Sequence, residues 1–340
     1  MDENIVNISN SKNVGLPLVS ILIPVYNCEK FIRETIESVL SQTYEKIEVI
    51  IINDGSTDNT ENVILSFQDS RIKYFKNTKN QKLIETLNIG LDYCNGKYIA
   101  RIDADDIALP ERIEKQVLFL ENNQECVVLG TSAYIINHDG ISVDNLTYHC
   151  KSNDISFLMA FYCPVIHPSV LIRSDIIRTN NLKFDKEYLH AEDYEFWTRI
   201  SKFGEISNLE IPLIKYRTHS SQISKLNQVF QIEQQKKIAK KYARLKLVNF
   251  NDYELDFLFE YEDSKLSFHD KLNSLIKFQR DYILECSLKN KYLLTKFKNL
   301  VLESDSITLL GIFTVFSSKL FFKNKWTIKQ IIGILFKLLK

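Results

Sequence analysis

From residue 18 onward, short runs of β-branched residues alternate with segments whose apolar residues recur at helical spacing. The run 47–52 is almost uninterrupted isoleucine and valine, as expected for a strand covered by helices on both faces. The pattern predicts strands at 18–25, 47–52, 72–75, 98–102 and 127–136, and helices at 31–40, from 57, at 83–93 and at 110–121. Four strand–helix units in succession predict an α/β fold with a mainly parallel sheet and right-handed crossovers.

After residue 150 this alternation loosens. The pattern still predicts a helix at 155–161, a strand at 170–172 and a helix at 192–203, and from about 224 it is mostly helical with few breakers. We therefore expect three parts, which are a polar segment at 1–16, an α/β domain at 17–225 and a helical extension at 226–340.

Residues 306–340 differ from the rest of the chain in charge. The whole chain carries 43 basic and 43 acidic residues, so it has no general attraction for nucleic acid, and we expect no nucleic-acid partner. Residues 306–340 nevertheless contain six lysines and no acid, beside Trp326, Phe336 and many aliphatic residues. This composition suits a helix that lies on an anionic membrane surface. A helix packed on the α/β domain or on a second subunit is the alternative.

The start of the chain and its cysteines bear on location. Residues 1–13 are polar and include acids, unlike a signal peptide, and no run reaches the roughly 20 apolar residues that span a bilayer. The six cysteines form no Cys-x-x-Cys pair, and we interpret them as reduced thiols. These features predict a cytoplasmic protein, which 306–340 could hold at the inner face of the cell membrane.

Polar residues follow three of the predicted strands at the point where each strand ends. They are Pro24-Val25-Tyr26-Asn27, the segment 53–58 and the segment 103–106. In open α/β sheets, ligands bind beyond the carboxyl ends of the strands. We therefore expect the three clusters to converge on one edge of the sheet.

Asp103, Asp105 and Asp106 place three carboxylates within four residues. Like charges so close raise one another's pKa unless a cation neutralises them. Oxygen ligands without a nearby Cys or His suit Mg²⁺ or Mn²⁺. The three residues therefore predict a divalent metal site, with a solvated turn before the helix at Pro110 as the alternative. The segment 54–58 has a similar alternative as a turn with a helix N-cap.

Together these segments resemble glycosyltransferase family 2, whose members have the GT-A fold. The resemblance covers about residues 18–220 and rests on four segments: 19–27 (VSILIPVYN) resembles the opening strand, 51–58 (IINDGSTD) the uridine-binding turn, 101–106 (RIDADD) the D-x-D element, and Pro110-Glu111-Arg112 with Gln116 the helix after it. It implies a Rossmann-like, mainly parallel (mixed) sheet flanked by helices. It also implies a nucleotide-sugar half at about 17–125 and an acceptor half at about 126–225.

The resemblance implies roles for single residues at the donor. Asp54 is expected at the uracil or ribose, Asp103 near the ribose and the metal, and Asp105 on the metal that holds the diphosphate. Further donor contacts are implied for Pro24, Tyr26, Asn27, Arg101 and Ala104. The segment 80–82 stands where relatives often carry a glycine, so we expect the donor-side loop to differ.

Glu192 and Asp193 begin a predicted helix ahead of Phe196 and Trp197. Acids in a first turn are also favoured by the helix dipole alone. In the family such a pair supplies the catalytic base, which implies Asp193 as the base and Glu192 as its neighbour. Family members invert the anomeric carbon, and the attacking acceptor hydroxyl must lose its proton to such a carboxylate.

The segment 216–219 (YRTH) resembles a segment that closes over the donor in relatives. This implies that Arg217 contacts the diphosphate and that His219 is a metal ligand. A lone histidine, such as His219 or His167, is otherwise a hydrogen-bonded structural residue.

The resemblance implies a hexosyl- or N-acetylhexosaminyltransferase that moves a sugar from a nucleotide-diphosphate donor, a UDP-sugar, to a saccharide or lipid-linked acceptor. Surface polysaccharide synthesis, of lipopolysaccharide or capsule, is the expected setting. An inactive sugar-nucleotide-binding protein is one alternative. A sugar nucleotidyltransferase is another, although it should carry a glycine-rich loop after the first strand, and 24–27 has no glycine.

Overall fold

The computed structural model describes residues 15–148, 152–219 and 228–260, together with residues 266, 267, 270, 271, 273–275, 277, 278 and 296. These residues divide into two compact units, one within 1–152 and 164–234 and the other within 153–163 and 235–340. The lysine-rich segment 306–340 lies outside the described residues, so both interpretations of it stay predictions.

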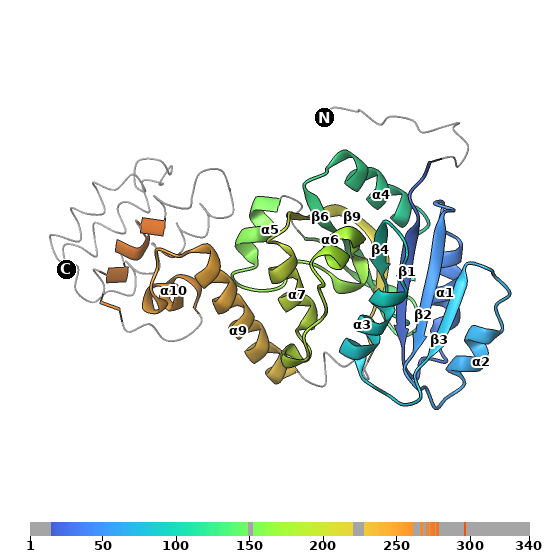
Figure 1. Cartoon of the computed structure of the whole chain (residues 1–340). Helices are drawn as coiled ribbons and strands as arrows, with labels where there is room; N and C mark the ends of the chain where they lie inside the picture. The colour runs from blue at the N-terminus through green and yellow to red at the C-terminus, as the bar shows by residue number, and fades with distance from the viewer. Residues whose placement is uncertain are drawn as a thin grey trace. The chain divides into compact units, whose positions relative to one another are not determined.

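A nine-stranded mixed sheet forms the centre of the first unit (Figure 1). Its strands are β1 (Val19–Val25), β2 (Ile47–Asn53), β3 (Ile72–Lys76), β4 (Tyr98–Arg101), β5 (Ile107–Ala108), β6 (Cys126–Ile136), β7 (Ser142–Leu146), β8 (Leu171–Arg173) and β9 (Glu205–Arg217). They follow the order β3-β2-β1-β4-β8-β6-β9-β5, and β7 pairs with β6. The first four are parallel, whereas β8 is antiparallel to both β4 and β6. The predicted α/β class with a mixed sheet is confirmed.

The helices are α1 (Ile32–Leu40), α2 (Thr60–Leu65), α3 (Leu83–Tyr93), α4 (Arg112–Asn122), α5 (Ser152–Leu158), α6 (Ser174–Thr179), α7 (Glu192–Ile200), α9 (Gln228–Lys246) and α10 (Asp252–Phe259), with single 3₁₀ turns η1 (His167–Ser169) and η2 (Lys186–Tyr188). The helix predicted from 57 begins at Thr60. The two residues before it are hydrogen-bonded to the loop after β1 instead: the Thr57 N–H donates to Asn27 Oδ1, and Asp58 Oδ2 accepts from the Glu29 N–H.

Strands β1 and β2 are buried along their whole length, which accounts for their β-branched sequences. Alternate residues of β1, such as Val19, Ile21 and Ile23, share one core with α1 and α4. Leu22 points to the opposite face, under α3. A Cβ atom at Gly90 of α3 would lie 2.3 Å from Leu22 Cδ1, so glycine permits the close approach of this helix to the sheet.

The long strand β9 is the main element that the sequence pattern did not predict. It runs parallel to β6, and the register shifts twice near Pro212. Proline and the charged residues Glu210 and Lys215 interrupt the alternation of apolar and polar positions that identifies a strand. β5, β7 and α6 were not predicted either, because each is short.

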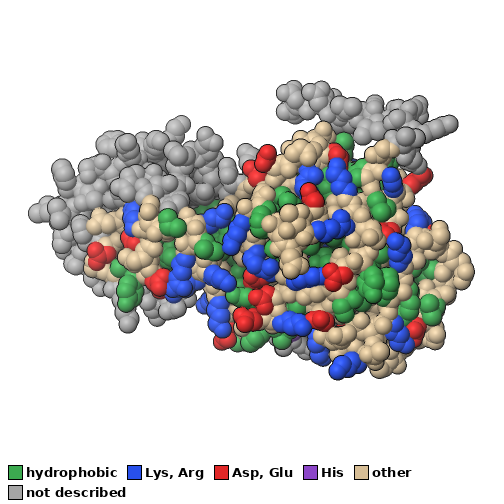
Figure 2. All heavy atoms as spheres, viewed as in Figure 1, with side chains coloured by type: hydrophobic (Ala, Val, Ile, Leu, Met, Phe, Trp, Pro, Cys, Tyr) green, Lys and Arg blue, Asp and Glu red, His purple; other side chains and the backbone are tan. Residues whose placement is uncertain are grey.

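The second unit is helical where it is described. Ser156 Oγ on α5 lies 3.0 Å from the Tyr242 hydroxyl on α9, and the ring centroids of Phe259 and Phe278 lie 5.9 Å apart. Among the described residues, no helix has the length and apolar composition needed to cross a membrane. On the visible face of the first unit, basic and acidic side chains are interspersed (Figure 2).

Candidate active site

The loops after β1 and β2 are tied together by hydrogen bonds. Asn27 Oδ1 accepts from the Thr57 N–H at 2.8 Å, and the Asn27 N–H donates to Ser56 Oγ at 3.0 Å. Asn27 has a left-handed backbone with φ of +48°, which asparagine tolerates better than most residues. Tyr26, whose side chain is exposed, lies in the loop directly after β1, whereas Pro24 is buried within that strand. The first two polar clusters therefore meet, as predicted.

The Asp54 carboxylate organises the loop that precedes α3. It accepts hydrogen bonds from Asn77 Nδ2 at 2.8 Å and from the backbone N–H groups of Gln81 and Lys82 at 2.8 and 2.9 Å. The adjacent Gly55 has φ of +70°, and a Cβ there would lie 2.8 Å from the Lys79 carbonyl carbon. Asp54 and Gly55 thus fix the path of the loop 77–82.

The third cluster gathers three carboxylates. Asp103, Asp105 and Asp106 each have an oxygen within 4.8 Å of the others. Burial raises the pKa of Asp106 well above its usual range, and the charges of Asp105 and Asp103 add to this effect. Its Oδ2 is buried and has no hydrogen-bond partner among the described residues, although its Oδ1 accepts from the Arg217 N–H at 2.8 Å.

This donor set fits a hard divalent cation. All three groups offer carboxylate oxygens, and a positive ion would neutralise the charges and satisfy the orphaned Asp106 oxygen. Both Asp103 oxygens accept from Arg101 and one Asp105 oxygen contacts His219, but the two side chains are still 30% and 19% exposed, so an ion can reach each of them. Mg²⁺ and Mn²⁺ are the ions that such oxygen ligands favour.

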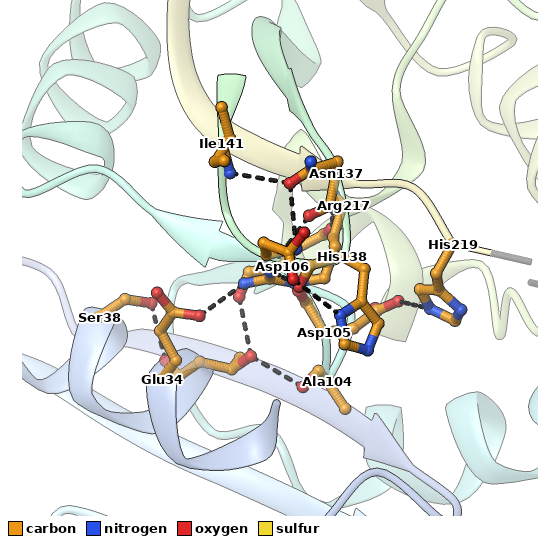
Figure 3. A network of polar contacts seen from close by, with 12 residues as sticks. Glu34, Ser38, Ala104, Asp105, Asp106, Asn137, His138, Ile141, Arg217 and His219 are labelled. Carbon is orange, nitrogen blue, oxygen red and sulfur yellow. Dashed lines mark hydrogen bonds and ion pairs between the residues drawn. The ribbon is translucent and has the colours of Figure 1, made fainter. Parts of the chain in front are cut away.

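The end of β9 closes this loop from the other side. His219 Nε2 lies at hydrogen-bond distance from Asp105 Oδ2, 2.9 Å away, and the role of His219 as a metal ligand stays a prediction. Arg217 is only 2% exposed, and Figure 3 shows its side chain among the acidic loop, Glu34 and the turn at His138. Its Nε donates to the Asp105 carbonyl at 2.8 Å and its Nη2 to Glu34 Oε2 at 2.5 Å. The diphosphate contact implied for Arg217 stays a prediction, whereas these bonds brace the acidic loop.

Helix α4 supplies a second brace behind the loop. Arg112 Nη2 donates to the Arg101 and Val170 carbonyls at 2.7 and 3.2 Å, and burial lowers the pKa of Arg112 to about 9. Gln116 Nε2 donates to the Leu129 and Ser169 carbonyls at 2.8 and 2.9 Å. The arginine and glutamine noted in the sequence therefore link strands rather than reach the open edge of the sheet.

Glu192 and Asp193 occupy the first turn of α7, behind Ala191 at the N-cap. Burial, together with the neighbouring charge of Asp193, raises the pKa of Glu192 to about 7. Burial also raises the pKa of Asp193, and the Tyr194 N–H and the positive charge of Arg101 oppose this shift. The charge of Asp103 adds to the rise in the pKa of Asp193. A carboxylate with a raised pKa can serve as a general base.

Two residues of this site carried no sequence signal of function. Thr35 Oγ1 lies 2.8 Å from both the Ala104 and the Asp106 carbonyls, and Cys28 Sγ lies 3.3 Å from the Ala104 carbonyl. Thr35 lies on the mainly apolar buried face of α1, and a polar residue on such a face is the signal that could have identified it.

Comparisons with known proteins agree with this geometry. The model of the family described as glycosyl transferase family 2 matches residues 20–175. An uncharacterized glycosyltransferase of Haemophilus influenzae is 41% identical over 232 residues, covering 65% of this chain and 72% of the relative. The Escherichia coli protein WfaP, named UDP-Glc:alpha-D-GlcNAc-diphosphoundecaprenol beta-1,3-glucosyltransferase, is 35% identical, covering 62% of this chain and 80% of WfaP.

Among solved structures, S. aureus TarS 1-349 in complex with UDP-GlcNAc superposes with a TM-score of 0.54 at 16% identity. The superposition covers 84% of this chain and 80% of TarS 1-349. At this identity the likeness concerns the fold, and it confirms the GT-A class that the sequence motifs implied.

Proposed function

The chain belongs to glycosyl transferase family 2, and from this premise we propose that it transfers a glycosyl group from a UDP-sugar to a saccharide or lipid-linked saccharide, with inversion and with the help of a divalent cation. The observation that carries the proposal is the cluster of Asp103, Asp105 and Asp106 after β4, whose oxygens lie within 4.8 Å of one another. Such a carboxylate set can hold the cation, and the Glu192–Asp193 pair in the first turn of α7 supplies the candidate base that the reaction also needs.

The donor side is assigned to the loops after β1, β2 and β4. The first loop contains Tyr26 and Asn27, directly after Pro24 of β1. The second loop contains Asp54, and the third contains Asp103, Ala104 and Asp105. Asp105 and His219, with Asp103 or Asp106, would hold the cation, which offsets the negative charge that grows on the leaving diphosphate. The name of WfaP supports UDP as the nucleotide, because that relative uses UDP-Glc.

The transfer step follows from the base. The acceptor oxygen attacks the anomeric carbon from the face opposite the diphosphate, and its new C–O bond forms as the bond to the β-phosphate oxygen breaks. Asp193 takes the proton of the acceptor hydroxyl, and UDP leaves with the electron pair. Attack from the opposite face inverts the configuration. Glu192, which is buried, is the acidic neighbour of the base.

The class of sugar and acceptor is part of the proposal. A hexosyl or N-acetylhexosaminyl donor and an acceptor used in surface polysaccharide synthesis agree with WfaP, whose named acceptor is a diphosphoundecaprenol-linked GlcNAc. A lipid-linked acceptor would place the enzyme at the inner face of the cell membrane, held there peripherally by residues 306–340.

The test is a panel of nucleotide sugars, each incubated with the full chain and Mn²⁺, with and without EDTA. Release of UDP from one UDP-sugar, and its loss with EDTA, supports the proposal, and NMR of the product anomeric proton checks inversion. Tight binding of a UDP-sugar without any turnover would favour the alternative of a non-catalytic binding protein.

A further inference from the structure

Asn88 of α3 uses its whole side-chain amide to bind the backbone of one residue that comes 96 residues later in the chain. Its Nδ2 donates to the Phe184 carbonyl at 2.9 Å, and its Oδ1 accepts from the Phe184 N–H at 2.8 Å. This exchange of two bonds resembles a hydrogen-bonded pair of an antiparallel ladder. The two bonds together fix both the place and the direction of the Phe184 backbone.

Phe184 in turn packs on the helix that carries the acid pair. Its ring is buried and stacks on Phe196 of α7, with centroids 4.3 Å apart and an angle of 20° between the planes. The residue before it is bound to the same helix, since Arg199 Nη2 donates to the Lys183 carbonyl at 2.6 Å. The backbone at 183–184 is therefore held by both α3 and α7.

The chain between η2 and α7 is strained. His190 has a left-handed backbone with φ of +67°, a conformation that costs free energy in a non-glycine residue and persists only where neighbouring contacts hold it. The next residue, Ala191, donates its N–H to the Tyr188 carbonyl at 3.0 Å, and Asp193 follows in the first turn of α7. Contacts at 183–184 therefore help to set where this first turn lies.

Helix α3 is a firm support for these contacts. The helix lies close to β1 at Gly90, where a Cβ would be 2.3 Å from Leu22 Cδ1. Just before the helix, the N–H groups of Gln81 and Lys82 donate to the Asp54 carboxylate. Helix α3 is thus tied both to the sheet and to the loop after β2.

Two ion pairs also link α3 to the segment 183–186, and both reach solvent. Lys183 pairs with Asp92, and Lys186 Nζ lies 2.5 Å from Glu85 Oε2. The Asp92 and Lys186 side chains are 71% and 73% exposed, and such pairs contribute little to stability. Removal of the Asn88 amide, in contrast, would take two hydrogen bonds from the backbone of a buried residue.

We propose that Asn88 is a positioning residue: it holds the segment 183–191, and through it the first turn of α7, in the place that the reaction requires. The proposal rests on the proposed function, in which Asp193 of this turn is the base. A general base must come within hydrogen-bond reach of the proton that it takes, and a displacement of about 1 Å can lower a rate by about a hundredfold. The effect of Asn88 on the reaction therefore passes through the place of Asp193.

The first test is the split between kcat and KM. Asn88→Ala removes both bonds to Phe184, and Asn88→Asp keeps the shape and the bond from the Phe184 N–H but loses the bond to the carbonyl. The reaction is UDP release from the sugar nucleotide that the wild type turns over, with Mn²⁺ and with water as the acceptor. In both variants kcat should fall by about 10–100-fold, while KM changes by less than about threefold.

Asn180→Ala is the matched control for this split. The Asn180 amide donates to the Ile176 carbonyl of α6 at 2.9 Å, so the variant also removes a hydrogen bond from a side-chain amide to a carbonyl. It should lower stability and leave kcat unchanged.

A double-mutant cycle separates positioning from a general structural effect. In the Asp193→Asn background, Asn88→Ala should lower the remaining turnover by less than about twofold, because the base whose place it sets is already gone. If Asn88→Ala lowers turnover by the same factor in both backgrounds, Asn88 does not act through Asp193 and the proposal is overturned.

Hydrogen exchange of the full chain measures the same contact without any substrate. Peptides that cover 183–196 should exchange about fivefold faster in Asn88→Ala than in the wild type, because the segment loses two hydrogen bonds. Peptides from β1 and β2 should exchange as in the wild type, and Asn180→Ala should leave 183–196 unchanged. If Asn88→Ala fails to fold, Asn88→Asp takes its place in the cycle and in the exchange measurement.

Unchanged exchange at 183–196 overturns the proposal. So does a raised KM with an unchanged kcat, which would make Asn88 a donor contact. A wild-type chain that turns over no sugar nucleotide would instead defeat the proposed function. The exchange measurement would then still decide whether Asn88 holds the segment that leads into α7.

Discussion

His219 Nε2 lies 2.9 Å from Asp105 Oδ2, and this contact joins the end of β9 to the loop after β4 across 114 residues of sequence. Phe31 stacks on the imidazole with ring centroids 5.6 Å apart and so fixes the plane of the ring. A carboxylate oxygen and an imidazole nitrogen are therefore held side by side at the end of β9.

We expect Asp105→Asn to weaken Mn²⁺-dependent binding of UDP and to lower turnover by about a hundredfold or more, because the amide offers the cation a neutral ligand in place of an anionic one. Calorimetric titration with UDP, with and without EDTA, measures the first effect. Asp144→Asn on the exposed strand β7 is the control and should bind UDP like the wild type. Full UDP affinity of the wild type in EDTA would rule out the metal assignment.

Asp193→Asn should lower turnover by about 10²–10⁴-fold, since the amide keeps the size of the side chain but cannot accept the acceptor's proton. UDP affinity should stay within a few fold, because the base faces the acceptor. Asp175→Asn, an exposed first-turn acid of α6, controls for the helix-dipole effect and should leave turnover unchanged. Lost UDP binding with normal turnover per bound donor would assign Asp193 a different role.

Glu192 should make the protein less stable as the pH rises. Burial, with the charge of Asp193, raises its pKa from 4.5 to about 7, so the folded state favours the protonated acid. The stabilisation is complete below pH 4.5 and is lost as the pH rises through 7. Glu192→Gln should therefore match the wild type in urea unfolding at pH 4.5 and be more stable by up to about 3 kcal/mol at pH 8. The exposed Glu111→Gln should show no such difference, and an equal effect of Glu192→Gln at both pH values would refute the assignment.

Gly55→Ala should cost more stability than Gly140→Ala. Both glycines have a left-handed backbone, with φ of +70° and +80°, so backbone strain destabilises each alanine variant by about 1–2 kcal/mol. Only at Gly55 would the new Cβ collide with backbone, 2.8 Å from the Lys79 carbonyl carbon, whereas at Gly140 the nearest atom is 3.7 Å away. Urea unfolding of the two variants measures the excess, and equal losses would show that the 77–82 loop yields easily.

Replacing the six lysines of 306–340 by glutamine should release part of the full chain from anionic liposomes and make the remaining binding insensitive to salt. Each lysine contributes about 1 kcal/mol near an anionic surface, and salt screens this term, whereas the apolar side chains act independently of salt. The wild type should sediment with anionic vesicles and be only partly released by high salt. If it ignores vesicles of either charge, the segment is a packed structural element.

The donor side of the fold could be predicted because its signals are local. Strands β1 and β2 are continuous apolar runs, and the three aspartates of the cluster are close in sequence, so their proximity follows from the chain itself. The mixed sheet order could not be predicted in the same way. β8 was predicted as a strand at 170–172, but its antiparallel direction between two longer strands has no periodic signal.

The hydrogen bonds of Arg217 could not be predicted from the sequence either. The segment 216–219 implied that Arg217 contacts the donor diphosphate. In the structure its guanidinium donates hydrogen bonds to the Asp105 and His138 carbonyls and to the Glu34 carboxylate. Which partner a buried arginine finds depends on tertiary packing, and no spacing along the chain encodes it. The same holds for Thr35, whose hydroxyl supports the acidic loop from another helix.

The hydrogen bonds of Arg217 also determine how late in protein synthesis the acidic loop 103–106 can be completed. Its bond to Glu34 spans 183 residues, and the partner of Asp105 is made two residues later still. The ribosome has therefore produced the whole nucleotide half long before the residues that close it emerge, and contacts of such separation form slowly. A nascent chain that ends after the loop 103–106 already has Arg101, which binds Asp103, but it lacks Arg217 and His219, which contact Asp105 and Asp106. The acidic loop therefore gains these last partners only after β9 has been translated and has paired with β6.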